Sequence, residues 1–439
     1  MRLLIIALQF FASLTILVMI HEMGHFLMAK LFKVRVEKFY LFFNPFFSLF
    51  KFKPKRSETT YGLGWLPLGG YVKLSGMVDE SMDTEQMKNA PQPWEFRTKP
   101  AWQRLIIIVM GVVFNFLLAL VIYTSIAFHY GEQYIPLQSI KAGLEFSDVA
   151  KKAGFRDGDI LLRADDKCLM KADENTFRTV MESKRIVVMR DGEETEITLP
   201  DDFMMQVIEG NTGVFSFRYP FVIDRVMDGS RAERAGLLAG DSLVGVSDSL
   251  TPAYVSTCVK IFAEHRNDPL LVRVSRNEEI VDVQVTPDVD GRIGVYMKPI
   301  SSFYQLEKES YGLLESVSVG VKRGFGRLFN YAGDMKYVFT KAGAQSVGGF
   351  MSIGSLFPYP FNAYAFWEMT AFLSVILAFM NILPIPALDG GHAVFILYEM
   401  IFRRKPSQNV VVKAQMIGMF LLLLLFVYAN VNDLFRFLG

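Results

Sequence analysis

Apolar residues gather in four long segments, separated by polar stretches of very different length. The segments are Leu3–Phe32, Leu105–Phe128, Phe366–Leu383 and Met416–Val431. Each approaches the roughly 20 residues that an α-helix needs to cross about 30 Å of hydrocarbon. The pattern predicts a multi-span α-helical membrane protein with about four transmembrane helices.

Composition and charge set the class of protein and its orientation. At 51% hydrophobic residues and a mean hydropathy of +0.27, the chain is too apolar for an ordinary soluble enzyme. A net charge of +1 argues against nucleic acid as a partner. Residues 30–104 carry thirteen Lys/Arg against seven Asp/Glu, and Arg403-Arg404-Lys405 lies between the last two segments. The positive-inside rule therefore predicts that both loops are cytoplasmic and that residues 130–365 and both termini face the other side.

The first apolar segment contains the sequence His21-Glu22-Met23-Gly24-His25. On a helix, His21 and His25 lie one turn apart and face the same way, so their imidazoles can bind one Zn²⁺. Glu22 then lies beside the metal, where its carboxylate can accept a proton from water. Charge predicts that these residues are in the cytoplasmic half of the first span, a costly place for polar groups without a function. The alternative is that both histidines are helix-end residues at the headgroup level.

A third zinc ligand is expected where the third segment ends, because the same charge rule brings that end to the same depth. A catalytic zinc site takes three protein ligands and keeps one position open, and Asp389 is the candidate. Pro384 and Pro386 would break the helix there and leave backbone groups to be satisfied by protein or substrate. Two alternatives stay open. His392 could supply a ligand, or the turn at Asp389 could be only a polar exit from the membrane.

The long polar stretch between the second and third segments contains an internal repeat. Ala153–Leu161 recurs 82 residues later as Ala235–Leu243, and alternating apolar strands follow each copy. The arrangement resembles a PDZ domain, which is a mostly β fold, and two copies fit residues 130–300. PDZ folds commonly bind an extended peptide along a sheet edge. The alternative is a pair of spacers or size filters without a specific ligand.

Together these motifs resemble the site-2 protease family of intramembrane metalloproteases, and within it the RseP-type group with tandem PDZ domains. The most specific parts are the HExxH motif and Asn381…Pro384-Ile385-Pro386…Leu388-Asp389-Gly390. Gly111–Asn115 is similar to the family's G-x-x-x-N pattern in the second span, and Gly69–Lys73 to its membrane re-entrant β-loop. The resemblance implies that His21, His25 and Asp389 bind zinc and that Glu22 is the catalytic base.

Other residues are candidates for contact with a substrate. Gly62–Gly70 is too short to span and is expected to form a re-entrant hairpin, whose Gly69 and Gly70 could pair with an unwound substrate as an added strand. Asn381 and Asn115 could donate hydrogen bonds to that strand, although a buried amide in helix packing is the alternative for both. Residues 310–335 read as an amphipathic helix, either on the membrane surface or packed on the PDZ pair.

The features imply an intramembrane zinc endopeptidase of the bacterial inner membrane, with the PDZ pair on the extracytoplasmic side. In the resembled group the substrates are single-span membrane proteins, namely anti-sigma factors and remnant signal peptides. The alternative is a catalytically silent scaffold that captures exported proteins, although an intact Glu22 argues against it. The expected domains are a first membrane half with the re-entrant loop (1–129), PDZ copies at 130–205 and 206–300, an amphipathic linker (301–365) and a second membrane half (366–439).

Overall fold

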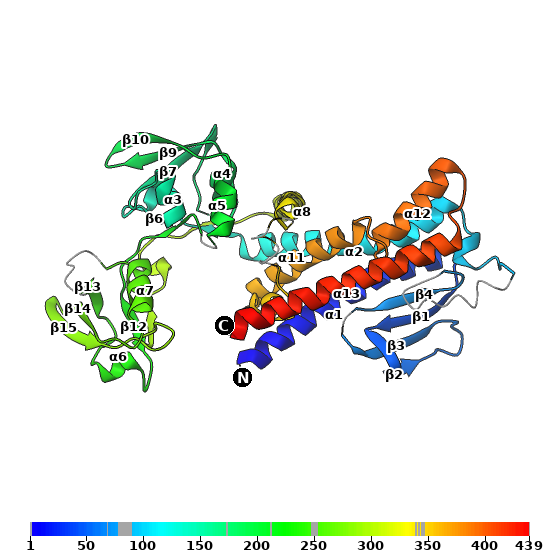
Figure 1. Ribbon diagram of the computed structural model, residues 1–439, viewed down its shortest axis with the longest axis horizontal. Coiled ribbons are helices and arrows are strands. Elements are labelled where there is room, and N and C mark those ends of the chain that lie inside the picture. Colours follow the sequence, from blue (N-terminus) through cyan, green and yellow to red (C-terminus); the bar gives the residue numbers. More distant parts are fainter. Residues whose placement is uncertain are drawn as a thin grey trace. The chain divides into compact units, whose positions relative to one another are not determined.

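The computed structural model divides the chain into two units, which are described separately (Figure 1). The first unit combines residues 1–131 with 310–439, and the second comprises residues 132–309. The structure describes residues 2–438 except 68, 78–89, 173, 211–212, 247–252, 339, 341–342 and 344–346.

Among the described residues, four helices of the first unit are long and apolar enough to cross a bilayer. They are α1 (Arg2–Leu31), α2 (Ala101–Tyr130), α11 (Ala363–Ile382) and α13 (Gln408–Leu438). At 1.5 Å per residue, about 20 residues cover the 30 Å hydrocarbon core. The four predicted spans are confirmed, and α13 begins eight residues before the expected Met416.

Helix α2 contacts α1, α11, α8 (Leu313–Val338) and α12 (Asp389–Phe402). Small residues allow the closest approaches: a Cβ on Gly24 of α1 would lie 2.4 Å from the Met110 carbonyl oxygen, and one on Gly320 of α8 would lie 2.4 Å from Thr124 Oγ1. Helix α8 is the amphipathic helix expected at residues 310–335. It packs against the second and third spans, where Arg323 donates a 3.0 Å hydrogen bond to Glu368.

A four-stranded sheet lies between the first two spans in the sequence. Its strands are β1 (Val36–Leu41), β2 (Phe43–Phe52), β3 (Thr60–Leu66) and β4 (Tyr71–Leu74), in the spatial order β2-β3-β1-β4. Strand β1 pairs in parallel with β3 and antiparallel with β4. The expected hairpin at Gly62–Gly70 is wrong, because this segment holds only the last part of β3, and β1 lies between β3 and β4 in the sheet. The sequence reading missed β2 because that strand is apolar on both faces and shows no alternation.

The third span is followed by the break that was expected at Pro384 and Pro386, and then by a helix that was not predicted from the sequence. Helix α11 ends at Ile382, shortly before Pro384, and α12 (Asp389–Phe402) begins at Asp389. A Cβ on Gly390 would lie 2.1 Å from the Leu383 carbonyl oxygen, so only glycine allows this tight return of the chain. The break and the return fix where Asp389 lies relative to α11.

The second unit contains two halves with a similar order of elements, beginning with β6 (Leu144–Phe146) and β12 (Ile223–Val226), and the first half has an additional strand, β8, and an additional helix, α5. The first half continues with α3 (Asp148–Lys152), β7 (Ile160–Ala164), β8 (Lys167–Cys168), α4 (Glu174–Glu182), β9 (Arg185–Arg190), β10 (Glu193–Thr198), α5 (Phe203–Glu209) and β11 (Phe215–Phe217). The second continues with α6 (Arg231–Arg234), β13 (Ser242–Val246), α7 (Val255–Glu264), β14 (Leu270–Arg276), β15 (Glu279–Val285) and β16 (Val295–Met297). Short strands β5 (Glu132–Tyr134) and β17 (Glu307–Glu309) pair where the unit begins and ends.

The repeat seen in the sequence has the same local structure in both copies. Asp159 accepts two hydrogen bonds from Arg190, and Asp241 accepts two from Arg276. Each half has its own core of buried apolar residues. Val207 and Phe215 belong to the core of the first half, and β11 pairs with β6, so this half extends past the expected boundary at residue 205.

Candidate metal centre

His21, Glu22 and His25 lie in the second half of α1, on the side that faces α2. His25 Nδ1 lies 2.9 Å from the Ile107 carbonyl oxygen of α2. A carbonyl can only accept, so this contact puts the His25 proton on Nδ1 and leaves Nε2 free to bind a metal. The Nε2 atoms of His21 and His25 lie 3.3 Å apart.

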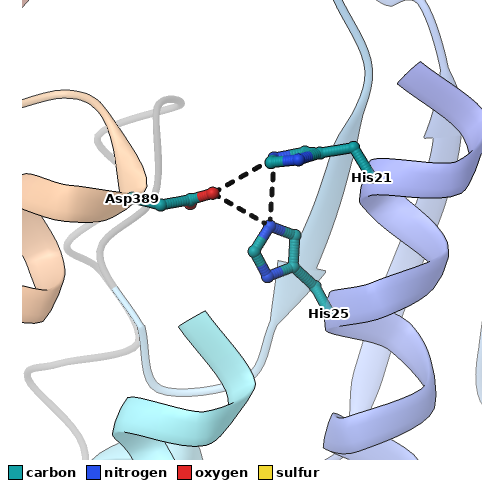
Figure 2. A group of neighbouring side chains, drawn as sticks. All are labelled: His21, His25 and Asp389. Carbon is teal, nitrogen blue, oxygen red and sulfur yellow. Dashed lines mark hydrogen bonds and ion pairs between the residues drawn. The ribbon is translucent and has the colours of Figure 1, made fainter. Parts of the chain in front are cut away.

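Asp389 approaches the two histidines from the opposite side, at the start of α12 (Figure 2). Its Oδ2 lies 3.1 Å from His21 Nε2 and 3.4 Å from His25 Nε2. This buried oxygen makes no hydrogen bond. The three atoms face one point from two elements that lie more than 360 residues apart in the sequence.

The geometry of these three atoms fits a tetrahedral zinc ion. Ligands about 2.0–2.1 Å from such an ion lie roughly 3.3 Å from one another, and the observed separations are 3.1, 3.3 and 3.4 Å. Two imidazoles and a carboxylate are also a donor set that zinc accepts. His21, His25 and Asp389 form the one group of this kind found among the described residues.

Asn115 of α2 lies behind His21 and is fully buried. Its Nδ2 is 3.3 Å from His21 Nδ1, while its Oδ1 is buried without a hydrogen-bond partner. The oxygen and nitrogen of an amide exchange places when the group turns over. With the amide turned, Oδ1 would accept the Nδ1 proton of His21, and both groups would be satisfied. This contact would hold His21 as the Ile107 carbonyl holds His25.

Glycines supply the space that the histidine rings occupy. A Cβ on Gly111 of α2 would lie 2.4 Å from His25 Nε2 and 2.8 Å from His21 Cε1. A Cβ on Gly70, next to β4, would lie 2.8 Å from Val18 Cγ1 and 3.1 Å from Glu22 Cγ. Both glycines were predicted as members of sequence motifs. The sequence did not predict that a side chain at Gly111 would collide with the histidine rings, or that one at Gly70 would crowd Glu22.

Two adjoining cavities of about 560 and 570 Å³ open onto the same group of residues. Both are lined by His21, Glu22, Asp389 and Gly70. The larger also meets Gly69, Asn381 and apolar side chains of α11 and α13. Gly69, Gly70 and Asn381 therefore line the cavities beside the cluster, whereas Asn115 lines neither cavity.

His392, the alternative ligand, lines both cavities but does not join the three-atom cluster. Gln415 Nε2 of α13 lies 2.9 Å from His392 Nε2. The sequence reading missed Gln415 and the Ile107 carbonyl. Neither carried a local signal, because both act through contacts between distant segments.

Comparison with known proteins covers nearly the whole chain. The sequence profile of Peptidase family M50 matches residues 9–425. A protein of Haemophilus influenzae named regulator of sigma E protease is 27% identical, over 98% of this chain and 98% of that protein. Proteins of Borreliella burgdorferi and Thermotoga maritima, both provisionally named zinc metalloproteases, are 28% and 25% identical. They cover 96% and 98% of this chain and 96% and 99% of their own length.

Proposed function

The chain belongs to peptidase family M50, and we propose that it cleaves peptide bonds within the membrane with a zinc ion held by His21, His25 and Asp389. It is a zinc metalloendopeptidase of the site-2 protease type and a bacterial membrane protein. The observation that carries the ligand assignment is the convergence of two Nε2 atoms and Asp389 Oδ2 at separations of 3.1–3.4 Å.

A bound zinc ion would lower the pKa of water towards neutrality and polarise the scissile carbonyl. His25 keeps its proton on Nδ1 through the Ile107 carbonyl, and Asn115 would hold His21 in the same way with its amide turned so that Oδ1 faces His21 Nδ1. Glu22 is next to His21, lines both cavities and would transfer a proton during the reaction. Its carboxylate takes a proton from the attacking water and gives it to the leaving amine nitrogen.

The expected substrates are single-span membrane proteins, including anti-sigma factors and remnant signal peptides. Two observations support a membrane substrate. His21, Glu22 and His25 lie on α1, which is long and apolar enough to cross a bilayer, and one of the two cavities is lined by apolar residues of α11 and α13. The name of the Haemophilus relative, regulator of sigma E protease, agrees with a role in sigma-factor signalling.

Substrate binding is assigned to the residues that line this cavity. Asn381 could donate hydrogen bonds to an unwound substrate strand, and the backbone at Gly69 and Gly70 could pair with it. The two halves of residues 132–309 are proposed to be PDZ folds on the extracytoplasmic side, opposite the basic loops. Two observations support this proposal. The two halves have a similar order of elements, and in each half an aspartate of the repeat, Asp159 or Asp241, forms an ion pair with an arginine.

The test is cleavage of a tagged single-span protein by the purified chain in lipid. Glu22→Gln should keep about one zinc per chain and lower cleavage by roughly 10²- to 10⁴-fold. Glu58→Gln is the matched control, because Glu58 is an exposed carboxylate outside the cavities, and it should leave cleavage unchanged. Undiminished cleavage by Glu22→Gln would remove Glu22 from its role. Capture of the tagged protein without cleavage by the unaltered chain would favour the scaffold alternative.

A further inference from the structure

The edge strand β2 carries large apolar side chains that are more than half exposed. They are Phe46 (100% exposed), Phe47 (56%), Leu49 (62%), Phe50 (63%) and Phe52 (55%); we name them the β2 rim. Strand β2 lies at the opposite edge of the sheet from β4, and in Figure 1 it is on the side of the sheet away from α1. An exposed aromatic surface of this kind marks an interaction site.

The aromatic end of the β2 rim, at residues 44–47, is held in place by specific contacts. Residues 44–47 bulge outward between the paired positions Phe43–Leu66 and Ser48–Gly64. Trp65 donates a 2.8 Å hydrogen bond from Nε1 to the Pro45 carbonyl, and its ring stacks on Phe47. Phe46 is held at φ +72°, a region that a bulky side chain rarely adopts. The fold therefore holds Phe46 in the fully exposed position.

The other end of the strand is strongly basic. Lys51, Lys53, Lys55 and Arg56 fall within six residues, and all four are exposed. None of them forms a salt bridge with a carboxylate of the described chain. The basic residues thus begin with Lys51 near the end of β2 and continue into the residues that follow the strand.

This change from aromatic to basic residues runs along α1 from its middle to its last turn, the direction in which the predicted span leaves the membrane. Near the aromatic end of the sheet, Gly70 lies against Val18 and Glu22 in the middle of α1. Near the basic end, Lys30 of the last turn of α1 donates a 3.1 Å hydrogen bond to Thr59. The five steps from Ser48 to Lys53 cover roughly 17 Å at about 3.3 Å each, close to the ~15 Å depth of one hydrocarbon leaflet.

We propose that the β2 rim binds the acidic phospholipids of the leaflet beside it. The aromatic end inserts among acyl chains, and Lys51, Lys53, Lys55 and Arg56 pair with headgroup phosphates. Aromatic residues below a basic band are the pattern of surface-bound membrane segments. The lipid contact would fix the depth of the sheet whose far edge carries Gly70, beside Glu22. The proposal does not depend on the assignment of the zinc ligands.

The test uses the full chain in nanodiscs of phosphatidylcholine, with and without added phosphatidylglycerol. Hydrogen exchange is measured for residues 43–56. Phosphatidylglycerol should slow exchange of this segment several-fold, and high salt should remove the effect because exposed charges are screened. No response to phosphatidylglycerol in the unaltered chain would overturn the proposal.

Matched charge removal separates this surface from a general charge effect. In the triple variant Lys53→Gln, Lys55→Gln, Arg56→Gln, phosphatidylglycerol should no longer slow the exchange of residues 43–56. At about fivefold in affinity per cation, the loss of three charges lowers the affinity of this surface for phosphatidylglycerol by roughly 100-fold. Arg403→Gln, Arg404→Gln, Lys405→Gln removes the same charge from the other basic loop and should keep the response. Equal loss in both variants would contradict the proposal. The double variant Phe46→Ser, Phe47→Ser should speed the exchange of residues 43–56 in both lipid compositions. Unchanged exchange in this variant would contradict the proposed insertion of the aromatic side chains among acyl chains.

Discussion

Asp241 in the second unit and Asp389 in the first are carboxylates with opposite kinds of neighbour. In the second unit, Asp241 faces the guanidinium of Arg276 at 2.6 and 2.8 Å and accepts a further hydrogen bond from the Leu238 N–H. In the first unit, Asp389 faces two imidazoles, and its Oδ2 has no hydrogen bond. The first arrangement is complete as an ion pair. The second arrangement has the donor atoms and the spacing with which a zinc ion could be bound.

The largest expected effect comes from removing the carboxylate that faces the histidines. Asp389→Ala should lose about one zinc per chain, and cleavage should fall to background, because two imidazoles alone leave the site a ligand short. Asp241→Asn is the matched change in the second unit and should leave zinc content unaltered. Metal analysis of both purified variants checks this. Full zinc occupancy in Asp389→Ala would transfer the ligand role to His392.

A methyl group added beside the rings should have the next largest effect. In Gly111→Ala the new Cβ would lie 2.4 Å from His25 Nε2, so the ring must leave its position. Zinc affinity should fall by about 100-fold, at the upper end for residues that orient metal ligands. Gly326→Ala is the control, because nothing lies within 4 Å of a Cβ there. Competition with a zinc chelator measures both, and equal affinities would mean that the rings can move freely.

A smaller loss is expected when the amide behind His21 is replaced. Asn115→Leu keeps the volume but removes the acceptor for His21 Nδ1, and zinc affinity should fall by about 10-fold. Asn115→Asp restores an acceptor and should recover most of it. The Co²⁺-substituted chain gives a second measurement, because the visible spectrum of the metal responds to ligand geometry. An unchanged spectrum in Asn115→Leu would assign Asn115 to helix packing only.

The smallest expected effect is a loss of stability at acid pH, caused by protonation of the ion pair between Asp241 and Arg276 in the second unit. Burial of the Asp241 carboxyl raises its pKa, but the hydrogen bonds from Arg276 and Leu238 outweigh burial and hold the pKa below the ordinary value. The stability from this pair is therefore complete above the unfolded pKa of about 3.9 and is lost as pH falls through the lower folded value. The protection of the amides of residues 253–276 against hydrogen exchange, relative to the intrinsic rate at each pH, should stay constant from pH 7 to about 4 and then fall. Asp241→Asn should lack that acid-induced step, and a step at neutral pH would exclude this cause.

The sequence predicted those parts of the molecule that repeat a local pattern. Four apolar runs predicted α1, α2, α11 and α13, and the spacing of His21 and His25 predicted one shared face. The depth argument paired Asp389 with them, and the structure places it there. These features depend on periodicity and charge, which a single sequence contains.

Contacts between distant segments could not be predicted. The Ile107 carbonyl that orients His25 is a backbone atom and has no side-chain signal. Asn115 was expected to contact substrate, but the structure turns it towards His21, because α2 packs against α1 through Gly111 and Gly24. Strand β2 lacks alternation since its apolar residues face outward on both sides. In each case the deciding contact is tertiary.

Zinc K-edge X-ray absorption on the purified, active chain tests the central claim most directly. The account predicts about one zinc per chain, with scattering from two imidazole rings and from oxygen at about 2.0–2.2 Å. Loss of the imidazole signal in His25→Ala, with Glu22→Gln unchanged, would complete the assignment. An active chain without zinc, or a spectrum with sulfur scattering at about 2.3 Å, would contradict it.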